Sequence, residues 1–398
     1  MQKGKTVVLG VTGSIAAYKM ANVSSMLVKL GYEVHVIMTE NATNFINPIT
    51  FESLTGQKCL VDTFDRNFQF HVAHVSLAKR ADVFLVAPAS ANIIGKMANG
   101  LADDMLSTTL LAAKCPVLVA PAMNTNMYEN RIVQDNLSKL RQFGISVIEP
   151  AVGRLACGDT GSGKMPSEEV LVDYVLHEIE KEKDLFGKRI LVTAGATREA
   201  LDPVRFLTNH STGKMGYAVA KMAMLRGADV TLVTAKSEQK PPLFTEVVPV
   251  NSAQDMFEAV TARSAEMDMI VMAAAVADYR PKNVSEQKIK KRGKDLQLEL
   301  ERTDDILLYL GQHRQKGQII CGFSMETEQV LENSRKKLEK KHVDMIAANS
   351  LNEAGAGFAV DTNHLTLITQ ESETELEMMS KEAAADAILS ALLLLGNS

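Results

Sequence analysis

The sequence has few cysteines and no pattern that pairs them. Only four occur in 398 residues, Cys59, Cys115, Cys157 and Cys321, and no two of them form a Cys-x-x-Cys pair. Such wide spacing fits neither a disulfide framework nor a zinc site. It suits a reducing compartment, so we expect a cytoplasmic protein.

Net positive charge and long apolar runs are also missing. The formal net charge is −5, whereas a general nucleic-acid-binding protein usually has a basic surface. The opening MQKGKTVVLGVTGSIAAYK resembles a signal peptide, but Gly10, Gly13 and Ser14 interrupt its apolar run and Lys19 ends it. The stretch AILSALLLLG is too short to span a bilayer, so we expect a packed terminal helix. We therefore expect neither a nucleic-acid partner nor a membrane.

Two familiar phosphate-binding motifs are absent or incomplete. Neither half of the chain contains Gly-x-Gly-x-x-Gly. Residues 158–164 do spell Gly-x-x-x-x-Gly-Lys, but Met165 follows where a P-loop has the Ser or Thr that binds Mg²⁺. The preceding PAVGRL contains Pro150 and Gly153 and is typical of a loop rather than a buried strand. This segment is therefore interpreted as a glycine-rich loop.

Apolar runs alternate with helical patterns along the whole chain. TVVLGV, EVHVIM, VFLVAP and VLVAP are continuous apolar runs, as expected of parallel strands buried on both faces. The second half restarts in the same way, because KRILVTAGA echoes KTVVLGVTGS. Between the halves, a helix that begins near Ser167 ends in the charged stretch EKEKDLFGK. We predict an α/β fold of two Rossmann-like, doubly wound domains with mainly parallel sheets, flavodoxin-like in 1–184 and Rossmann-like in 188–398.

Polar segments follow several of the strands in the first half. Gly13-Ser14 precedes a helix and suits either a phosphate or an ordinary β–α turn. APASANIIGK and APAMNTNMY each follow an apolar run, and Asn126 in the second is expected to cap a helix. His74 stands just before the run VFLVAP.

These segments together resemble the homo-oligomeric flavin-containing cysteine decarboxylases. The resemblance also includes a Cys in the glycine-rich flap ACGDTGSGKM, and it departs at Tyr128, where the family often has Trp. It implies FMN bound at the subunit interface of a trimer. It would place Gly13, Ser14, Thr39 and Ser107 near the FMN phosphate, Ser90 and Asn92 in the same pocket, and Met123 near the ring.

The same resemblance implies three catalytic roles. His74 would be the base or would position the substrate, Asn124 would bind the substrate carboxylate, and Cys157 would donate a proton. FMN would supply the electron sink that allows CO₂ to leave.

A long loop and two basic runs mark the second half. About twenty residues, ATREALDPVRFLTNHSTGKM, separate its first strand from the next helix, and such loops in α/β sheets are usually functional. The runs KIKKRGK and KKLEKKH are either solvated faces or part of a triphosphate site.

This half resembles the phosphopantothenate–cysteine ligases through DPVRFLTNHSTGKMGYA, AAAVADYRP, KIKK and GFSMET. The resemblance implies CTP, 4′-phosphopantothenate and L-cysteine. Mg²⁺ is expected on the triphosphate oxygens, with few dedicated protein ligands. Lys288 would contact CTP and stabilise charge as an acyl-cytidylate forms, Asn209 would hold that intermediate, and Arg205 would bind substrate. The remaining CTP contacts would be Ala273, Ala274, Asp278, Asp305, Ile306, Phe323, Lys337 and Lys341. Thr303-Asp304 departs from the common bacterial Asn-Pro.

The fused order is that of bacterial bifunctional enzymes of coenzyme A synthesis, whose product would be 4′-phosphopantetheine. The resemblance implies homo-oligomers, with trimers of the first domain linked by dimers of the second into a dodecamer. One alternative is a flavin-dependent decarboxylase of peptide C-terminal cysteine, which needs no nucleotide site. Another is a flavin-binding regulatory subunit, which predicts a lost His or an acidic tail, whereas His74 is present.

Overall fold

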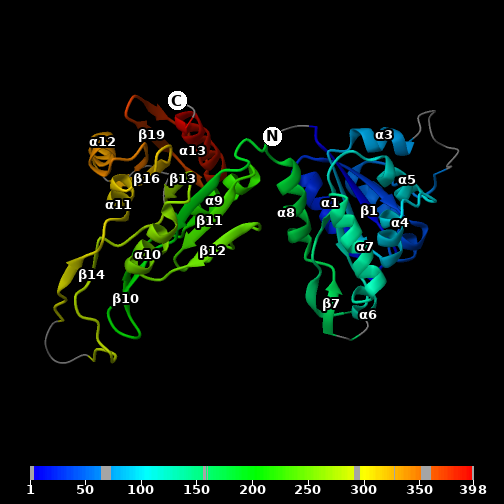
Figure 1. Ribbon diagram of the computed structural model, residues 1–398, viewed down its shortest axis with the longest axis horizontal. Helices are drawn as coiled ribbons and strands as arrows, with labels where there is room; N and C mark the ends of the chain where they lie inside the picture. The colour runs from blue at the N-terminus through cyan, green and yellow to red at the C-terminus, as the bar shows by residue number, and fades with distance from the viewer. Residues whose placement is uncertain are drawn as a thin grey trace. The chain divides into compact units, whose positions relative to one another are not determined.

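The chain forms two compact domains. The computed structural model describes residues 4–63, 73–155, 158, 160–290, 296–326, 328–350 and 360–396. It divides into Met1–Lys181 and Glu182–Ser398, here called the N-terminal and C-terminal domains (blue to green and green to red in Figure 1). The division falls just before the predicted boundary at 184–188.

The N-terminal domain contains a parallel sheet with strand order β2-β1-β3-β4-β5. Its strands are β1 (Thr6–Val11), β2 (Glu33–Met38), β3 (Val83–Ala89), β4 (Val117–Pro121) and β5 (Ser146–Val147). Every residue of β1 and β3 is buried, as expected for strands covered on both faces. This is the flavodoxin-like order, so the predicted fold class is confirmed for this domain.

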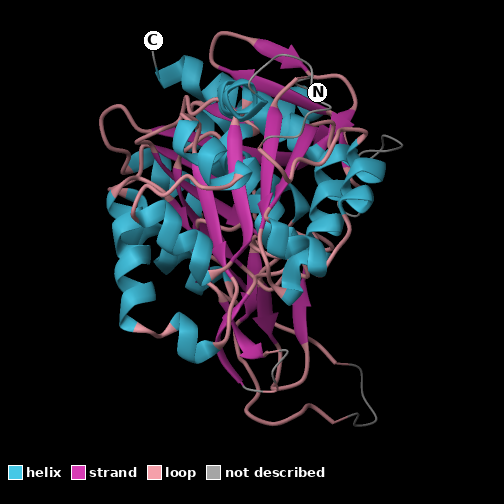
Figure 2. Cartoon of the chain, turned by 90° about the vertical axis from the view of Figure 1, so that its right-hand side faces the viewer, coloured by secondary structure: helices cyan, strands magenta, loops and turns pink. Residues whose placement is uncertain are grey.

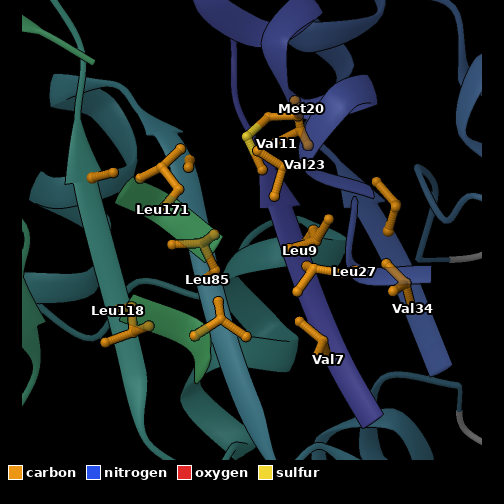
Figure 3. Close-up of a cluster of buried hydrophobic side chains, with 14 of the residues drawn as sticks. Val7, Leu9, Val11, Met20, Val23, Leu27, Val34, Leu85, Leu118 and Leu171 are labelled. Atoms are coloured by element: carbon orange, nitrogen blue, oxygen red, sulfur yellow. The ribbon is translucent and has the colours of Figure 1, made fainter. Parts of the chain in front are cut away.

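Helices cover both faces of that sheet. One face carries α1 (Lys19–Lys29), α2 (Pro48–Thr55) and α8 (Glu168–Ile179), and the other carries α3 (Ala73–Arg80), α4 (Ala91–Ala98), α5 (Met105–Ala112) and α7 (Arg131–Gln142). Short helical turns η1 (Ile15–Tyr18), η2 (Glu40–Asn44) and α6 (Thr125–Tyr128) lie in the loops. Figure 3 shows Leu9 and Val11 of β1 beside Val23 and Leu27 of α1 in the first core. The side chain of Ser167 caps α8, as the sequence indicated.

The C-terminal domain contains a larger sheet with strand order β12-β11-β8-β13-β16-β17-β19-β20. Its strands are β8 (Arg189–Ala194), β11 (Asp229–Thr234), β12 (Thr245–Pro249), β13 (Met269–Met272), β16 (Ile319–Glu326), β17 (Met345–Ser350), β19 (Leu365–Thr369) and β20 (Glu373–Glu375). In order of appearance the first six run 3-2-1-4-5-6 and are parallel, which is the Rossmann order and confirms the prediction. The antiparallel edge formed by β19 and β20 was not predicted.

Helices also pack against this sheet. Figure 2 shows the helices and strands of the chain coloured by type. The helices α10 (Ala253–Ser264), α11 (Ile306–Gln312) and α12 (Val330–Lys341) contribute to one core. Two further helices, α9 (Lys214–Leu225) and α13 (Lys381–Gly396), contact each other and the sheet. The predicted terminal helix is therefore confirmed. Within the described ranges, no helix is both long enough and apolar enough to cross a bilayer.

Short antiparallel ribbons extend from both sheets. They are β6 (Ala151–Arg154) with β7 (Thr160–Lys164), β9 (Arg198–Ala200) with β10 (Phe206–Thr208), β14 (Tyr279–Pro281) with β15 (Leu300–Arg302), and β18 (Thr362–Asn363) with β21 (Met379–Ser380). The prediction of a loop at 150–155 was therefore wrong, since 151–154 pairs with 160–164. Residues 160–164, where a P-loop would curve around a phosphate and begin its helix, instead form strand β7, so this segment is not a P-loop.

A buried arginine ties the beginning of the C-terminal domain to its end. Arg226 follows α9, and its guanidinium donates bidentate hydrogen bonds of 2.9 and 2.7 Å to the Asp184 carboxylate. The same side chain donates to Asp386 Oδ1 at 3.2 Å and Ser390 Oγ at 3.0 Å in α13. Charge-assisted bonds to a buried guanidinium are stronger than neutral ones, so this contact holds the two ends of the domain together.

We expect Gly216→Ala to lower the free energy of unfolding of the C-terminal domain by about 1–3 kcal/mol. A Cβ on Gly216 would lie 2.7 Å from Thr193 O, so α9 would have to move away from β8. The matched control is Gly95→Ala in α4, where the nearest atom would lie 3.7 Å away. That change should be neutral or stabilising by up to about 1 kcal/mol. Calorimetric unfolding measures both, and equal effects would contradict the close packing of α9.

Candidate functional site

The first candidate site lies where the strand order of the N-terminal sheet reverses, between β1 and β3. Thr12, directly after β1, is buried and donates a hydrogen bond to Pro88 O at 2.7 Å. Its hydroxyl also accepts one from the backbone N–H of Ser90 at 3.0 Å. The N–H of Ala122, after β4, donates to Ala89 O at 3.0 Å. The loops after β1, β3 and β4 are thus held together, at the edge where doubly wound sheets bind ligands.

The residues beside this switch point fit a flavin phosphate. Thr39 Oγ1 is buried and has no hydrogen-bond partner among the described residues. Such a hydroxyl is costly unless a ligand satisfies it. A Cβ on Gly13 would lie 2.8 Å from Asn41 Cβ, so only glycine lets the loop after β1 approach the segment after Thr39 this closely.

The other predicted flavin contacts follow the same strands. Ser14 caps η1 by accepting from Ala16 N at 3.4 Å, and Ser90 caps α4 by accepting from Ile93 N at 3.5 Å. Asn92 is exposed on α4. Ser107 is buried, and its hydroxyl bonds to the Asp104 carboxylate at 2.9 Å within a capping box. This helix-capping role competes with the predicted contact between Ser107 and a phosphate.

A cavity of about 460 Å³ lies beside the β6–β7 hairpin. It is lined by Ser14, Ile15, Ala16, Tyr18, Lys19, Ala122, Met123, Asn124, Arg154, Leu155, Gly163, Lys164 and Met165. The base of the hairpin is attached to the segment after β4, because Met123 N donates to Gly163 O at 3.0 Å and Thr125 Oγ1 donates to Ser162 O at 2.9 Å. A Cβ on Gly163 would lie 2.4 Å from Met123 O, so a larger residue would separate them.

The structure brings Ser14, Met123 and Asn124 into this cavity. Asn124 Oδ1 accepts from Asn126 N at 2.9 Å and caps α6, so the prediction that Asn126 is the cap was wrong. His74 lies at the beginning of α3 and does not line the cavity.

The predicted proton donor, Cys157, lies outside the described residues. Of the cysteines that are described, Cys59 and Cys321 are buried, and burial raises the pKa of each thiol to about 12. Burial also raises the pKa of Cys115. These three thiols are therefore poor proton donors and poor nucleophiles near neutral pH.

The second candidate site lies at the switch point of the C-terminal sheet, between β8 and β13. The hydroxyl of Thr193, in β8, accepts from Ala274 N at 3.1 Å, and that of Thr197 accepts from Ala277 N at 3.0 Å. Asn209 Nδ2, from the long loop after β8, donates to Ala275 O at 3.3 Å. The predicted residue Asn209 therefore lies next to the predicted segment after β13.

A cavity of about 720 Å³ lies beside this switch point. Of the predicted nucleotide contacts, Ala274, Asp278, Asp305, Ile306, Phe323, Lys337 and Lys341 line it, whereas Ala273 and Lys288 do not. The charged lining also includes Arg302, Lys340 and Asp304. Thr303 donates from Oγ1 to Ala277 O at 2.6 Å, so the departure at 303–304 packs directly against the segment after β13. The cavity is large enough for a nucleotide.

Two lysines of α12 are held in this cavity. Lys337 Nζ donates to Phe323 O at 2.9 Å, and Lys341 forms an ion pair with Asp305. Burial would raise the pKa of the Asp305 carboxyl, but the hydrogen bonds from Lys341 and Leu308 N and the nearby lysine charges together outweigh it, so the pKa is lowered. Asp305 Oδ1 also accepts from Leu308 N at 3.0 Å and caps α11. Both ends of this ion pair are therefore positioned by helices.

Two family models match the chain. The model described as "Flavoprotein" matches residues 1–180, and that described as "DNA/pantothenate metabolism flavoprotein C-terminal domain" matches 185–395. The coenzyme A biosynthesis bifunctional protein CoaBC of Bacillus subtilis is 46% identical over 385 residues, which are 96% of this chain and 95% of that protein. Its counterpart from Vibrio cholerae is 42% identical over 388 residues, 97% of each chain. This chain belongs to the CoaBC family.

A crystal structure of the C-terminal domain of a CoaBC protein is also similar, with 44% identity and a TM-score of 0.46. The similarity covers 53% of this chain and 96% of that one.

In this CoaBC-family chain, Asp202 and Arg205 clamp the segment that carries Lys288. Asp202 is buried, and Arg205 donates to its Oδ2 from Nε at 3.0 Å and from Nη2 at 2.6 Å. Asp202 Oδ2 accepts from Ile289 N at 3.0 Å, while Arg205 Nη2 donates to Ile289 O at 2.7 Å. The backbone N–H and C=O of Ile289, the residue after Lys288, are therefore both held by hydrogen bonds. Arg205 was predicted to bind substrate, but in this structure its guanidinium donates to Asp202 and to Ile289 O.

Sequence reasoning missed Thr12, Thr197 and the role of Asp202. An Asp-Pro pair often begins a turn, and Asp202 Oδ1 does accept from Val204 N and Arg205 N, both at 2.8 Å. That signal could have located the turn. No local signal connects it to Ile289, which is far away in sequence.

We expect Asp202→Asn to release the segment 285–290. Hydrogen exchange of that peptide, measured by mass spectrometry, should become about tenfold faster or more, since a charge-assisted contact is lost. The control is Asp229→Asn at the exposed start of β11, which should leave the peptide unchanged. Unchanged exchange in Asp202→Asn would disprove the clamp.

The hydrogen bonds that Asp202 makes in the wild-type clamp should survive a moderate fall in pH. The side chain of Arg205, helped by backbone N–H groups, holds the pKa of Asp202 well below its ordinary value against the opposing effect of burial. A carboxylate with a lowered pKa keeps its stabilising charge as the pH falls, until the lowered pKa is reached. Corrected for intrinsic rates, protection of 285–290 should therefore persist from about pH 7 to about pH 5.

Proposed function

We propose that the C-terminal domain ligates L-cysteine to 4′-phosphopantothenate with CTP, and that the N-terminal domain decarboxylates the product. The first reaction would pass through an acyl-cytidylate and release pyrophosphate. The second would convert phosphopantothenoylcysteine to 4′-phosphopantetheine and CO₂. Together they are two consecutive steps of coenzyme A synthesis, in agreement with membership of the CoaBC family.

The cavity of about 720 Å³ lined by α12 and by the segment after β13 carries this proposal. Its lining includes the segment after β13, one of the two strands of the Rossmann switch point, and basic side chains that suit a triphosphate. A decarboxylase of peptide C-terminal cysteine needs no such site, and neither does a flavin-binding regulatory subunit. The observation therefore favours the bifunctional enzyme over both alternatives.

Each residue of the ligase site would have one task. Lys337 and Lys341 would contact CTP from α12, with Asp305 and Phe323 beside them. Lys288 would stabilise negative charge as the phosphopantothenate carboxylate attacks the α-phosphorus and pyrophosphate leaves. Asn209 would hold the acyl-cytidylate while the cysteine amine attacks its carbonyl carbon and CMP leaves. Asp202 and Arg205 would position Lys288 through Ile289.

The decarboxylase site would hold FMN at the switch point of the N-terminal sheet. Gly13, Ser14 and Thr39 would surround its phosphate, Ser90, Asn92 and Ser107 would lie nearby, and Met123 would approach its ring. Bound FMN would supply the electron sink that an α-carboxylate beside a β-thiol lacks. Asn124 would bind the substrate carboxylate, His74 would act as base or position substrate, and Cys157 would return a proton.

Metal and assembly complete the proposal. Among the described residues no group of three or more His, Cys, Asp or Glu could hold a metal ion, so Mg²⁺ would bind mainly through the triphosphate.

Phe206, Tyr279 and Leu300 are exposed on the β9–β10 and β14–β15 ribbons, and we propose that these ribbons form dimers. Trimers of the N-terminal domain would then link the dimers into a dodecamer. We place the enzyme in the cytoplasm, where its free thiols remain reduced.

The purified chain should form 4′-phosphopantetheine from CTP, 4′-phosphopantothenate and L-cysteine with Mg²⁺, and should release CMP and pyrophosphate. Lys288→Gln should slow pyrophosphate release by about 100-fold or more, because a charge-stabilising contact is lost. Asn209→Asp should instead allow activation, so acyl-cytidylate should accumulate. Quenched-flow assays with mass spectrometry measure each species. Wild-type protein that forms no CMP would refute the ligase proposal, and Lys288→Gln at the wild-type rate would refute the role of Lys288.

Thr39→Val tests the flavin site without relying on turnover. Valine matches the shape of threonine but lacks the buried hydroxyl, which has no partner in the described protein. The flavin-free variant should therefore be as stable as wild type or more so, while its dissociation constant for FMN rises about tenfold or more. Thr12→Val is the contrasting variant, because its hydroxyl makes two hydrogen bonds and its loss should destabilise the fold by about 1–3 kcal/mol. Wild-type FMN affinity in Thr39→Val would argue against a phosphate there.

A further inference from the structure

The cavity beside the β6–β7 hairpin carries more positive charge than the proposed decarboxylation needs. Lys19, Arg154 and Lys164 line it, and no Asp or Glu of the described residues does. Asn124 is already available for the substrate carboxylate, and the redox step needs no further cation. These cations therefore have no role in the chemistry described above.

Among the described residues, two of the three have no ion-pair partner. Lys19 Nζ lies 3.7 Å from Glu168 Oε2, which neutralises it in part. No carboxylate of the described residues forms an ion pair with Arg154 or Lys164, whereas many other cations of this chain are paired. Like charges near one another repel unless an anion joins them. The pair is thus suited to a ligand that brings negative charge.

The hairpin places the two cations on adjoining strands. Arg154 ends β6 and Lys164 ends β7. A Cβ on Gly153 would lie 3.5 Å from both Cδ and Nζ of Lys164, so the lysine side chain runs across β6 at the residue next to Arg154. The ammonium group therefore lies close to Gly153, and both Lys164 and Arg154 line the cavity.

We propose that Arg154 and Lys164 form a subsite for the phosphate monoester of the decarboxylase substrate. This inference rests on the proposed function of the N-terminal domain and specifies its substrate class. A guanidinium binds phosphate through two parallel hydrogen bonds, and an ammonium adds a compact charge. The subsite separates a phosphorylated pantothenoyl compound from a peptide that ends in cysteine, which has no phosphate.

The position of the subsite also has a kinetic meaning. The phosphate is remote from the carbon that loses CO₂, so its binding energy serves to hold the reacting part of the substrate in place. Since both cations lie on the hairpin that the cavity adjoins, a bound phosphate would fix the hairpin against the substrate. Removal of the phosphate should therefore lower kcat/KM even though the reacting atoms are unchanged.

The experiment compares two substrates in the full-length, flavin-loaded protein. Phosphopantothenoylcysteine and pantothenoylcysteine differ only in the phosphate. Arg154→Ala and Lys164→Ala should each lower kcat/KM for the phosphorylated compound by about 10- to 100-fold and leave the other substrate unchanged. In the double variant the preference for phosphate should nearly vanish. Lys164→Arg should retain most of it, because the charge remains.

Lys29→Ala is the matched control, because Lys29 is exposed at the end of α1 and does not line the cavity. It should leave both substrates unchanged. An equal loss for both substrates in the cation variants would overturn the proposal and indicate a structural role. Loss of bound flavin, seen by its absorbance, with an unchanged substrate preference would assign the cations to the flavin phosphate and also overturn it.

A binding measurement separates this inference from the proposed function. If the wild-type protein decarboxylates neither compound, the decarboxylase proposal fails. Isothermal titration calorimetry then still decides the subsite, because the phosphorylated compound should bind at least about tenfold more tightly than the other, and only when Arg154 and Lys164 are present. Equal affinity for the two compounds would refute the subsite in either case.

Discussion

A buried threonine hydroxyl joins the two sides of each switch point, and both candidate sites depend on it. Thr12 bridges the loops after β1 and β3 in the first sheet, and Thr193 and Thr197 bridge those after β8 and β13 in the second. Two strands that diverge at their carboxyl ends would otherwise leave polar backbone groups unpaired. The hydroxyls pair some of these groups and keep the loops in register. Gly13 directly follows Thr12 in the first site. In the second site, Asn209 bonds to Ala275, which lies between the two residues that Thr193 and Thr197 hold.

The sheets themselves could be predicted from the sequence. Strands such as β1 and β3 are buried on both faces, so their sequences are uninterrupted apolar runs that end in turn residues. The repeat of that pattern in the second half indicated two sheets of the same class. Resemblance to known families added the candidate residues, and the structure brings Asn209 beside Ala275 and seven of the nucleotide contacts into one cavity.

The ribbons and the clamp could not be predicted, because nothing local encodes them. Segments 151–154 and 160–164 are largely exposed and contain several glycines, so they lack the alternation of a half-buried strand. Their pairing depends on contacts with Met123 and Thr125, which are distant in sequence. The clamp is similar, since Asp202 and Ile289 are far apart in sequence and are brought together only by the tertiary fold. Long-range polar contacts of this kind have no periodicity that a sequence could reveal.

The Arg226 network has a consequence for how such a protein can be built. Because Arg226 holds Asp184 and the α13 residues Asp386 and Ser390, the C-terminal domain begins and ends at one place on its own surface. A domain whose ends meet can be joined to another chain, separated from it, or given new ends elsewhere with little strain, because no internal contact is stretched. The domain is in this sense a transferable module.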